Sequence, residues 1–104
     1  MKTIQQGDIL HLSSPSVDIL VLSKDFFNRT GMVIACPLLK KASKDALHIP
    51  VTADGFTGIA LLEQLRSLDT NARFYKSVSH LSFEQIQNIS DAVQGIFDYY
   101  PFSI

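Results

Sequence analysis

The stretch TGIALLEQLRSLDTNARF, residues 57–74, changes from apolar to polar halfway along its length. Residues 57–65 form the most apolar of the strand-like runs and predict a buried strand at the centre of a sheet. Residues 66–72 are rich in charged and amide side chains, which is typical of a loop or a single helical turn. Residues 73–78 predict a final strand. Polar groups therefore gather where a strand leaves the core, and they predict one wall of a polar face.

Short apolar segments upstream of this stretch predict the remaining strands of a small sheet. The predicted strands are residues 7–13, 17–23, 32–39 and 46–51. Turn-forming residues separate them, including Pro15 among serines and Asp54-Gly55 at the end of the fourth. Pro37 has no N–H to donate, so it predicts an edge, a bulge or an end within the third strand.

The C-terminal region carries the strongest helical signal. Apolar residues recur there at helical spacing, namely Ile86, Ile89, Val93, Ile96 and Tyr100. Ser82 is the predicted N-cap, and Gln85 completes a capping box, while Leu81 and Ile86 are placed to form a hydrophobic staple. Pro101 is predicted to end the helix. The whole pattern predicts a mainly β fold with a C-terminal α-helix: a small, strongly bent antiparallel sheet, or SH3-like open barrel, with the helix packed on it.

Length and composition are those of an ordinary globular domain. The chain has 104 residues, 46% of them hydrophobic, and we expect residues 1–104 to form a single domain that needs neither disulfide nor metal to fold. The net charge of −1 excludes a general attraction to nucleic acid. Residues 1–81 nevertheless hold nine basic and seven acidic side chains, whereas residues 82–104 hold no Lys or Arg. This asymmetry is compatible with an anionic partner for the body of the domain.

Several classes of function lack support in the sequence. The three histidines and single cysteine show no metal-ligand spacing, and no glycine-rich phosphate loop is present, so we expect no metal and no cofactor. Cys36 lies in an apolar run and is interpreted as a buried filler. The N-terminus has no apolar signal-peptide core, and no apolar run reaches the roughly 20 residues of a membrane span. The expected location is therefore the cytoplasm.

A few polar residues are candidates for chemistry, each with a simpler structural alternative. Glu63 is placed to act as a general base or merely to bind backbone N–H groups of the next loop. Arg66 and Arg73 are suited to phosphate, or to pairing with Asp69. The lysines of the polar loop after residue 39 are interpreted as a solvated turn rather than a nucleic-acid clamp.

Three segments in this order resemble the MazF/PemK family of toxins from type II toxin–antitoxin systems. They are GDI at 7–9, LVLSKDFFNRTGMVIACP at 20–37, and TGIALLEQLRSLDTNAR at 57–73, which contains an acid–Gln–x–Arg–(Ser/Thr)–x–Asp pattern. The resemblance implies a CcdB/PemK-like barrel, a homodimer and a cognate antitoxin. It further implies metal-independent, sequence-selective cleavage of single-stranded mRNA lying in a groove near the dimer seam. Arg29, Gln64, Arg66 and Arg73 are the candidates for the face that binds RNA or a partner.

Two departures from the family pattern affect the expected activity. Active members have a long loop between the first two strands with a catalytic arginine, whereas residues 13–18 here are short and contain no arginine. Active members also place a catalytic threonine at the position that Leu39 occupies here, or Lys40 if the register shifts by one residue. The candidate replacements are Lys40 and Lys41 for the cation and His11 for the acid or base, with Glu63 also a candidate. Three readings follow. The first is a toxin-like endoribonuclease with weak or lost activity. The second is a non-catalytic homodimer that binds an antitoxin peptide, RNA or a protein target such as gyrase, and the third is a small β-rich domain of unrelated function.

Overall fold

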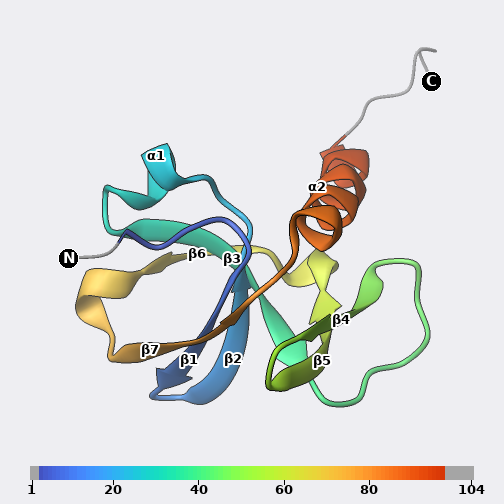
Figure 1. The fold of residues 1–104 in the computed structure, drawn as a ribbon, viewed down its shortest axis with the longest axis horizontal. Helices are drawn as coiled ribbons and strands as arrows, with labels where there is room; N and C mark the ends of the chain where they lie inside the picture. Colours follow the sequence, from blue (N-terminus) through green and yellow to red (C-terminus); the bar gives the residue numbers. More distant parts are fainter. Residues whose placement is uncertain (1–2, 98–104) are drawn as a thin grey trace.

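The computed structural model describes residues 3–97, which form one curled antiparallel sheet with a long helix against it (Figure 1). The strands are β1 (Asp8–Ser13), β2 (Ser16–Val21), β3 (Met32–Leu39), β4 (His48–Ala53), β5 (Phe56–Leu61), β6 (Arg66–Asp69) and β7 (Tyr75–His80). The α-helices are α1 (Asp25–Asn28) and α2 (Phe83–Phe97), and the 3-10 helices are η1 (Leu62–Gln64) and η2 (Thr70–Ala72). Within the described residues, neither α-helix is long and apolar enough to span a membrane. The mainly β prediction with a C-terminal helix is confirmed.

Strand β3 is the centre of the sheet, because it pairs with three other strands. The order is β4-β5-β3-β2-β1-β7, and β6 also pairs with β3. Residues 32–35 of β3 pair with β6, whereas residues 38–39 pair with β5 on the same edge. Pro37 lies between these two pairings, so its missing N–H falls where the edge of β3 changes partner. The prediction that residues 57–65 form the central strand is therefore wrong.

The polar half of residues 57–74 differs most from the sequence-based prediction. Strand β5 ends at Leu61, and the next three residues form η1 instead of continuing the strand. The predicted loop at 66–72 begins with β6, and the last strand starts at Tyr75, two residues later than predicted. Only Leu68 is buried in β6, so the segment has no alternation that a sequence could reveal. Its extended conformation depends on pairing with β3, which is a tertiary contact.

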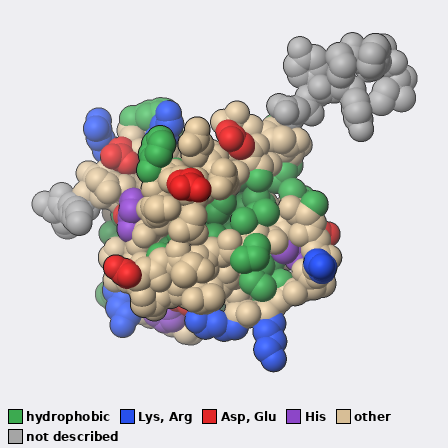
Figure 2. All heavy atoms as spheres, turned by 45° about the vertical axis from the view of Figure 1, so that its right-hand side comes forward, with side chains coloured by type: hydrophobic (Ala, Val, Ile, Leu, Met, Phe, Trp, Pro, Cys, Tyr) green, Lys and Arg blue, Asp and Glu red, His purple; other side chains and the backbone are tan. Residues whose placement is uncertain are grey.

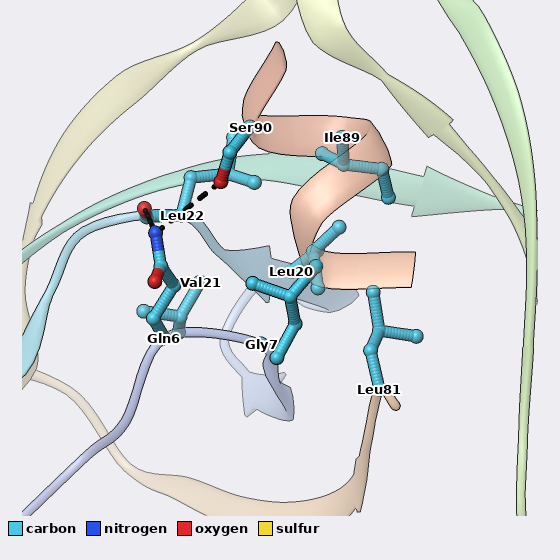
Figure 3. Close-up of a pocket in the computed structure, with 9 residues that line it drawn as sticks. Gln6, Gly7, Leu20, Val21, Leu22, Leu81, Ile89 and Ser90 are labelled. Carbon is cyan, nitrogen blue, oxygen red and sulfur yellow. Dashed lines mark hydrogen bonds between the residues drawn. The ribbon is translucent and has the colours of Figure 1, made fainter. Parts of the chain in front are cut away.

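Two apolar clusters cover the two faces of the sheet. The first lies beneath α2 and includes Leu20, Leu81 and Ile89, which lie together in Figure 3. There Gln6 Nε2 also donates to the Leu22 carbonyl oxygen at 2.9 Å, with Ser90 Oγ at 3.4 Å. Figure 2 shows hydrophobic side chains gathered in the middle of one face and Lys and Arg side chains along its lower edge. The second cluster occupies the other face and consists of Leu10, Leu12, Ile19, Val21, Val33, Ala35 and Leu68.

The start of α2 follows the predicted cap only in part. The Gln85 backbone N–H donates to Ser82 Oγ at 3.3 Å, as in a capping box. The Gln85 side chain does not return to the Ser82 backbone; it binds both the N–H and the carbonyl oxygen of Thr52 in β4. Because β4 is an edge strand, this contact satisfies backbone groups that the sheet leaves unpaired. The predicted helix end at Pro101, like Tyr100, lies outside the described residues.

Candidate functional site

A groove of about 590 Å³ opens above the second apolar cluster. Its lining comes from the β1–β2 hairpin, the middle of β3, and the segment from η1 to β7. The lining residues are Leu12, Pro15, Val17, Ile19, Ala35, Cys36, Pro37, Gln64, Leu65, Arg66, Leu68 and Arg73. A volume of this size lies within the range of pockets that hold small-molecule ligands.

Arg66 and Arg73 give the groove its charge. Neither guanidinium forms an ion pair with a carboxylate within residues 3–97; the ion pairs found there all involve histidine. The Nε atom of Arg73 is buried and has no hydrogen-bond partner. An unpaired buried donor on a cation is costly, so contacts within the described residues do not fully satisfy this guanidinium. Two planar guanidinium groups facing one groove therefore suit phosphate or carboxylate oxygens.

The 3-10 geometry of η1 sends three consecutive side chains in three directions. With three residues per turn, neighbouring side chains project about 120° apart. Leu62 is completely buried in the core, Glu63 contacts His48, and Gln64 lines the groove. A continued strand would instead have placed Glu63 on the same face as Leu61. This turn gives the three residues after the apolar run at 57–61 different surroundings. Leu62 packs in the core, Glu63 contacts His48, and Gln64 lines the groove.

His48 braces η1 through two hydrogen-bond contacts. Its Nε2 lies 2.8 Å from Glu63 Oε2, and its Nδ1 lies 2.7 Å from the carbonyl oxygen of Ser43. The Ser43 carbonyl and, next, the Glu63 carboxylate raise the pKa of His48 above its usual value. The hydrogen bond from His48 and the backbone N–H of Glu63 lower the pKa of that carboxyl. Both shifts favour the charged forms, so the contact gains the character of an ion pair.

Sequence reasoning did not single out His48, although a signal was available. The predicted Asp54-Gly55 turn, taken as a two-residue hairpin, pairs residue 48 with residue 61, and the structure has this register. A histidine opposite the end of β5 then comes within reach of the following acid. The groove-lining Pro37 and Leu65 were also not predicted, because apolar side chains give no chemical signal.

The other predicted site residues lie elsewhere. His11 alternates with groove-lining Leu12 along β1, so it lies on the opposite face, where Nδ1 is 2.8 Å from Asp18 Oδ1. Lys40 stacks over the Phe56 ring at 4.8 Å and donates to the Thr57 carbonyl oxygen. Neither Lys40 nor Lys41 lines the groove.

Arg29 and Glu63 also lie outside the groove lining. Arg29 lines a separate cavity of about 170 Å³ together with Asn71 and Tyr75. Glu63 is turned toward His48 rather than toward ligand space. Of the predicted RNA or partner face, only Gln64, Arg66 and Arg73 are therefore brought together in one groove.

Proton-transfer groups are scarce in the groove. Cys36 is the only lining residue other than the arginines with an ionisable side chain, and that side chain packs in the first apolar cluster. Burial, followed by the nearby Glu63 charge, raises its pKa to about 12. The thiol is therefore protonated and inert at neutral pH. No group of three His, Cys, Asp or Glu side chains within residues 3–97 is arranged to hold a metal ion.

Residues 18–97 match the family model described as PemK-like, MazF-like toxin of type II toxin–antitoxin system. The chain belongs to this toxin family. At the level of sequence, no curated protein matches it. The resemblance inferred from residues 57–73 and their neighbours is thus confirmed.

Solved structures show the same fold in other members. The MazE-MazF complex from Deinococcus radiodurans aligns with a TM-score of 0.83 and 22% identity, over 93% of this chain and 98% of that one. An endoribonuclease from a Mycobacterial species aligns with a TM-score of 0.80 and 15% identity, over 97% and 98% of the two chains. An endoribonuclease in complex with its cognate antitoxin, also Mycobacterial, aligns with a TM-score of 0.79 and 14% identity, over 94% and 99%.

The structure also shows how the family's first loop is shortened in this toxin. Ser13 pairs with Ser16, so only Ser14 and Pro15 remain as the turn between β1 and β2. Pro15 and Val17 form an apolar rim there. The second departure, Leu39, is the last residue of β3 and does not line the groove.

Proposed function

We propose that this toxin binds single-stranded RNA in the Arg66–Arg73 groove and cleaves it slowly or not at all. The observation that carries the proposal is the pair of guanidinium groups without carboxylate partners, one with a buried unpaired Nε, in a groove of about 590 Å³. Guanidinium groups bind phosphate oxygens in two-point contacts and also stack on exposed bases. Gln64 adds an amide that can read the edge of a base.

The lining supports binding better than cleavage. Attack of a ribose 2′-OH on the adjacent phosphate needs a base to take its proton, an acid to protonate the leaving oxygen, and cations for the charged transition state. Arg66 and Arg73 fit the third role. A protonated Cys36 thiol and amide or aliphatic neighbours supply neither of the first two. Each missing proton-transfer group lowers the cleavage rate by roughly 10²- to 10⁴-fold. We therefore expect RNA to bind even though cleavage is slow or absent.

The cognate antitoxin is the proposed partner, and a homodimer the proposed assembly. Structural relatives include a MazE-MazF complex and an endoribonuclease with its cognate antitoxin. A carboxylate-bearing antitoxin segment would satisfy the same guanidinium groups as RNA phosphate does. We therefore expect antitoxin and RNA to compete for the groove. Residues 1–104 are proposed to act as one domain.

Fluorescence anisotropy with a labelled 10-nucleotide RNA tests binding, and gel analysis of the same RNA tests cleavage. We expect saturable binding that weakens with salt, and intact RNA after prolonged incubation. R66A/R73A should lose binding, while K76A, which changes an exposed lysine outside the groove, should keep it. Rapid cleavage would contradict the catalytic half of the proposal. Equal binding by wild type and R66A/R73A would contradict the assigned groove.

A further inference from the structure

The contacts of His48 define its protonation state. Its two ring nitrogens face the Ser43 carbonyl oxygen and the Glu63 carboxylate, and neither of these groups can donate a hydrogen bond when Glu63 is ionised. A neutral imidazole has only one N–H, so it can satisfy only one of them. Both contacts are therefore made together only by the imidazolium form.

The other two histidines have no such requirement. His11 has Asp18 at one nitrogen and Ser16 Oγ at the other, at 3.3 Å, and a serine hydroxyl can donate to a neutral ring. His80 contacts Asp8 through Nδ1 at 2.6 Å, which one N–H satisfies. All three histidines are paired with a carboxylate, but only His48 joins two acceptors.

The two acceptors belong to segments that are far apart in the sequence. Ser43 lies in the connection between β3 and β4, and Glu63 lies in η1. The main further link is a hydrogen bond from the Leu62 N–H to the Leu47 carbonyl oxygen at 3.0 Å. His48 thus fixes the outer side of η1 while Leu62 fixes its inner side. The direction of Gln64 into the groove depends on both anchors, because the turn is only three residues long.

We propose that His48 is a positioning residue whose imidazolium form holds η1 in place, so that the affinity of the groove for RNA falls as His48 loses its proton. This inference rests on the proposed RNA-binding function of the groove. The two contacts of His48, to the Ser43 carbonyl oxygen and to the Glu63 carboxylate, form what we call the brace. The brace is intact when His48 is charged and Glu63 is ionised. It is weakened on the alkaline side, when the imidazolium deprotonates, and on the acidic side, when Glu63 is protonated.

The surrounding charges favour the charged form of His48. Glu63 and Asp45 are the ionisable groups that act on the ring, and both are acidic. Asp45 is itself held in place, since its side chain accepts from the Leu47 N–H at 2.8 Å and its carbonyl oxygen accepts from the His48 N–H. The raised pKa of His48 and the lowered pKa of Glu63 widen the pH window in which both groups are charged: it extends from below the ordinary pKa of a glutamate to above that of a histidine.

Binding of the labelled RNA between pH 6 and 9 tests the inference on the full chain. Wild-type affinity should fall by roughly three- to tenfold as His48 deprotonates, which corresponds to the net contribution of about one ordinary hydrogen bond. H48Q should bind at the weaker level at every pH, because one amide cannot donate to both acceptors in this geometry. H11Q is the matched control and should keep the wild-type profile. Identical profiles for wild type and H48Q would overturn the inference.

A second measurement separates this inference from the proposed function. Hydrogen exchange reports the Leu62 N–H directly, with no RNA present, and NMR of the ring nitrogens reports their protonation. We expect a high protection factor for the Leu62 N–H and two protonated ring nitrogens for His48 at pH 7. The protection factor, which corrects for the base catalysis of exchange itself, should be lower in H48Q and should fall in wild type as His48 deprotonates. A wild-type protein that binds no RNA would contradict the proposed function alone. A neutral His48 ring at pH 7, or exchange that H48Q leaves unchanged, would contradict the positioning role.

Discussion

The two sides of the groove differ in what their backbones hold in place. On the side formed by η1 and β6, a buried leucine, an ion pair and strand pairing to β3 position Gln64 and Arg66. On the hairpin side, a two-residue turn presents Pro15 and Val17, which have no group able to bind or transfer a proton. The difference predicts that RNA binding and RNA cleavage are separable in this toxin, because one side carries charge while the hairpin side presents no proton-transfer group.

The largest expected effect comes from removing the inner anchor of the charged side. L62A deletes a completely buried side chain, and truncations of this kind cost about 2–5 kcal/mol. L39A, at the exposed end of β3, should cost far less. Urea unfolding of both variants measures the two free energies. If the two variants were equally stable, η1 would not depend on its core anchor.

The second-largest expected effect is on RNA affinity, and it should differ between variants on the two sides of the groove. R66A removes a charged contact worth about 1.5–3 kcal/mol, so RNA affinity should fall by roughly tenfold to a hundredfold. The slope of log affinity against log salt should also decrease in magnitude by about 0.7, as for one lost phosphate contact on a single strand. V17A on the hairpin side should change the affinity by less than about twofold. Anisotropy titrations at several salt concentrations test both; a V17A defect as large as that of R66A would remove the distinction between the sides.

Much of the difference between the two sides of the groove can be predicted from sequence. The 3-10 turn that places Gln64 in the groove cannot. Apolar periodicity predicts α2 and most strands. The order and spacing of the segments at 7–9, 20–37 and 57–73 together indicate the family. The 3-10 turn at Leu62–Gln64 is invisible to periodicity, because three residues are too few to show a repeat. Strand β6 was missed for a related reason: its conformation comes from pairing with β3, not from its own side chains. His11 lies away from the groove because side chains alternate between the two faces along β1, and it contacts Asp18 instead. Lys40 follows the end of β3 and lies over the Phe56 ring.

Adding charge to the hairpin side should sharpen the comparison. P15R places a guanidinium at the apolar rim of the groove that Arg66 and Arg73 also line. One more phosphate contact should raise RNA affinity by roughly three- to tenfold and steepen the salt slope by about 0.7. P15Q is the uncharged control. RNA cleavage should stay near the wild-type level in both variants, because neither supplies an acid or a base. A large gain in cleavage by P15R would show that a cation alone was missing.

The smallest expected effect is on the pH dependence of the protein's stability, to which the His48–Glu63 contact contributes. His48 has a raised pKa in the folded state, so its contribution is fully present below its unfolded pKa and is lost as pH rises through the folded value. Glu63 has a lowered pKa, so its contribution is present above its unfolded pKa and is lost as pH falls through the folded value. E63Q removes both contributions from the Glu63 contact. Its melting temperature should therefore lie slightly below that of wild type near neutral pH and converge with it toward both extremes. Thermal unfolding followed by circular dichroism measures the two curves, with D18N as the control for a histidine pair on the opposite face. Curves for E63Q and wild type that run parallel across the pH range would show that the His48–Glu63 contact carries no charge, and the braced side of the groove would then depend on packing alone.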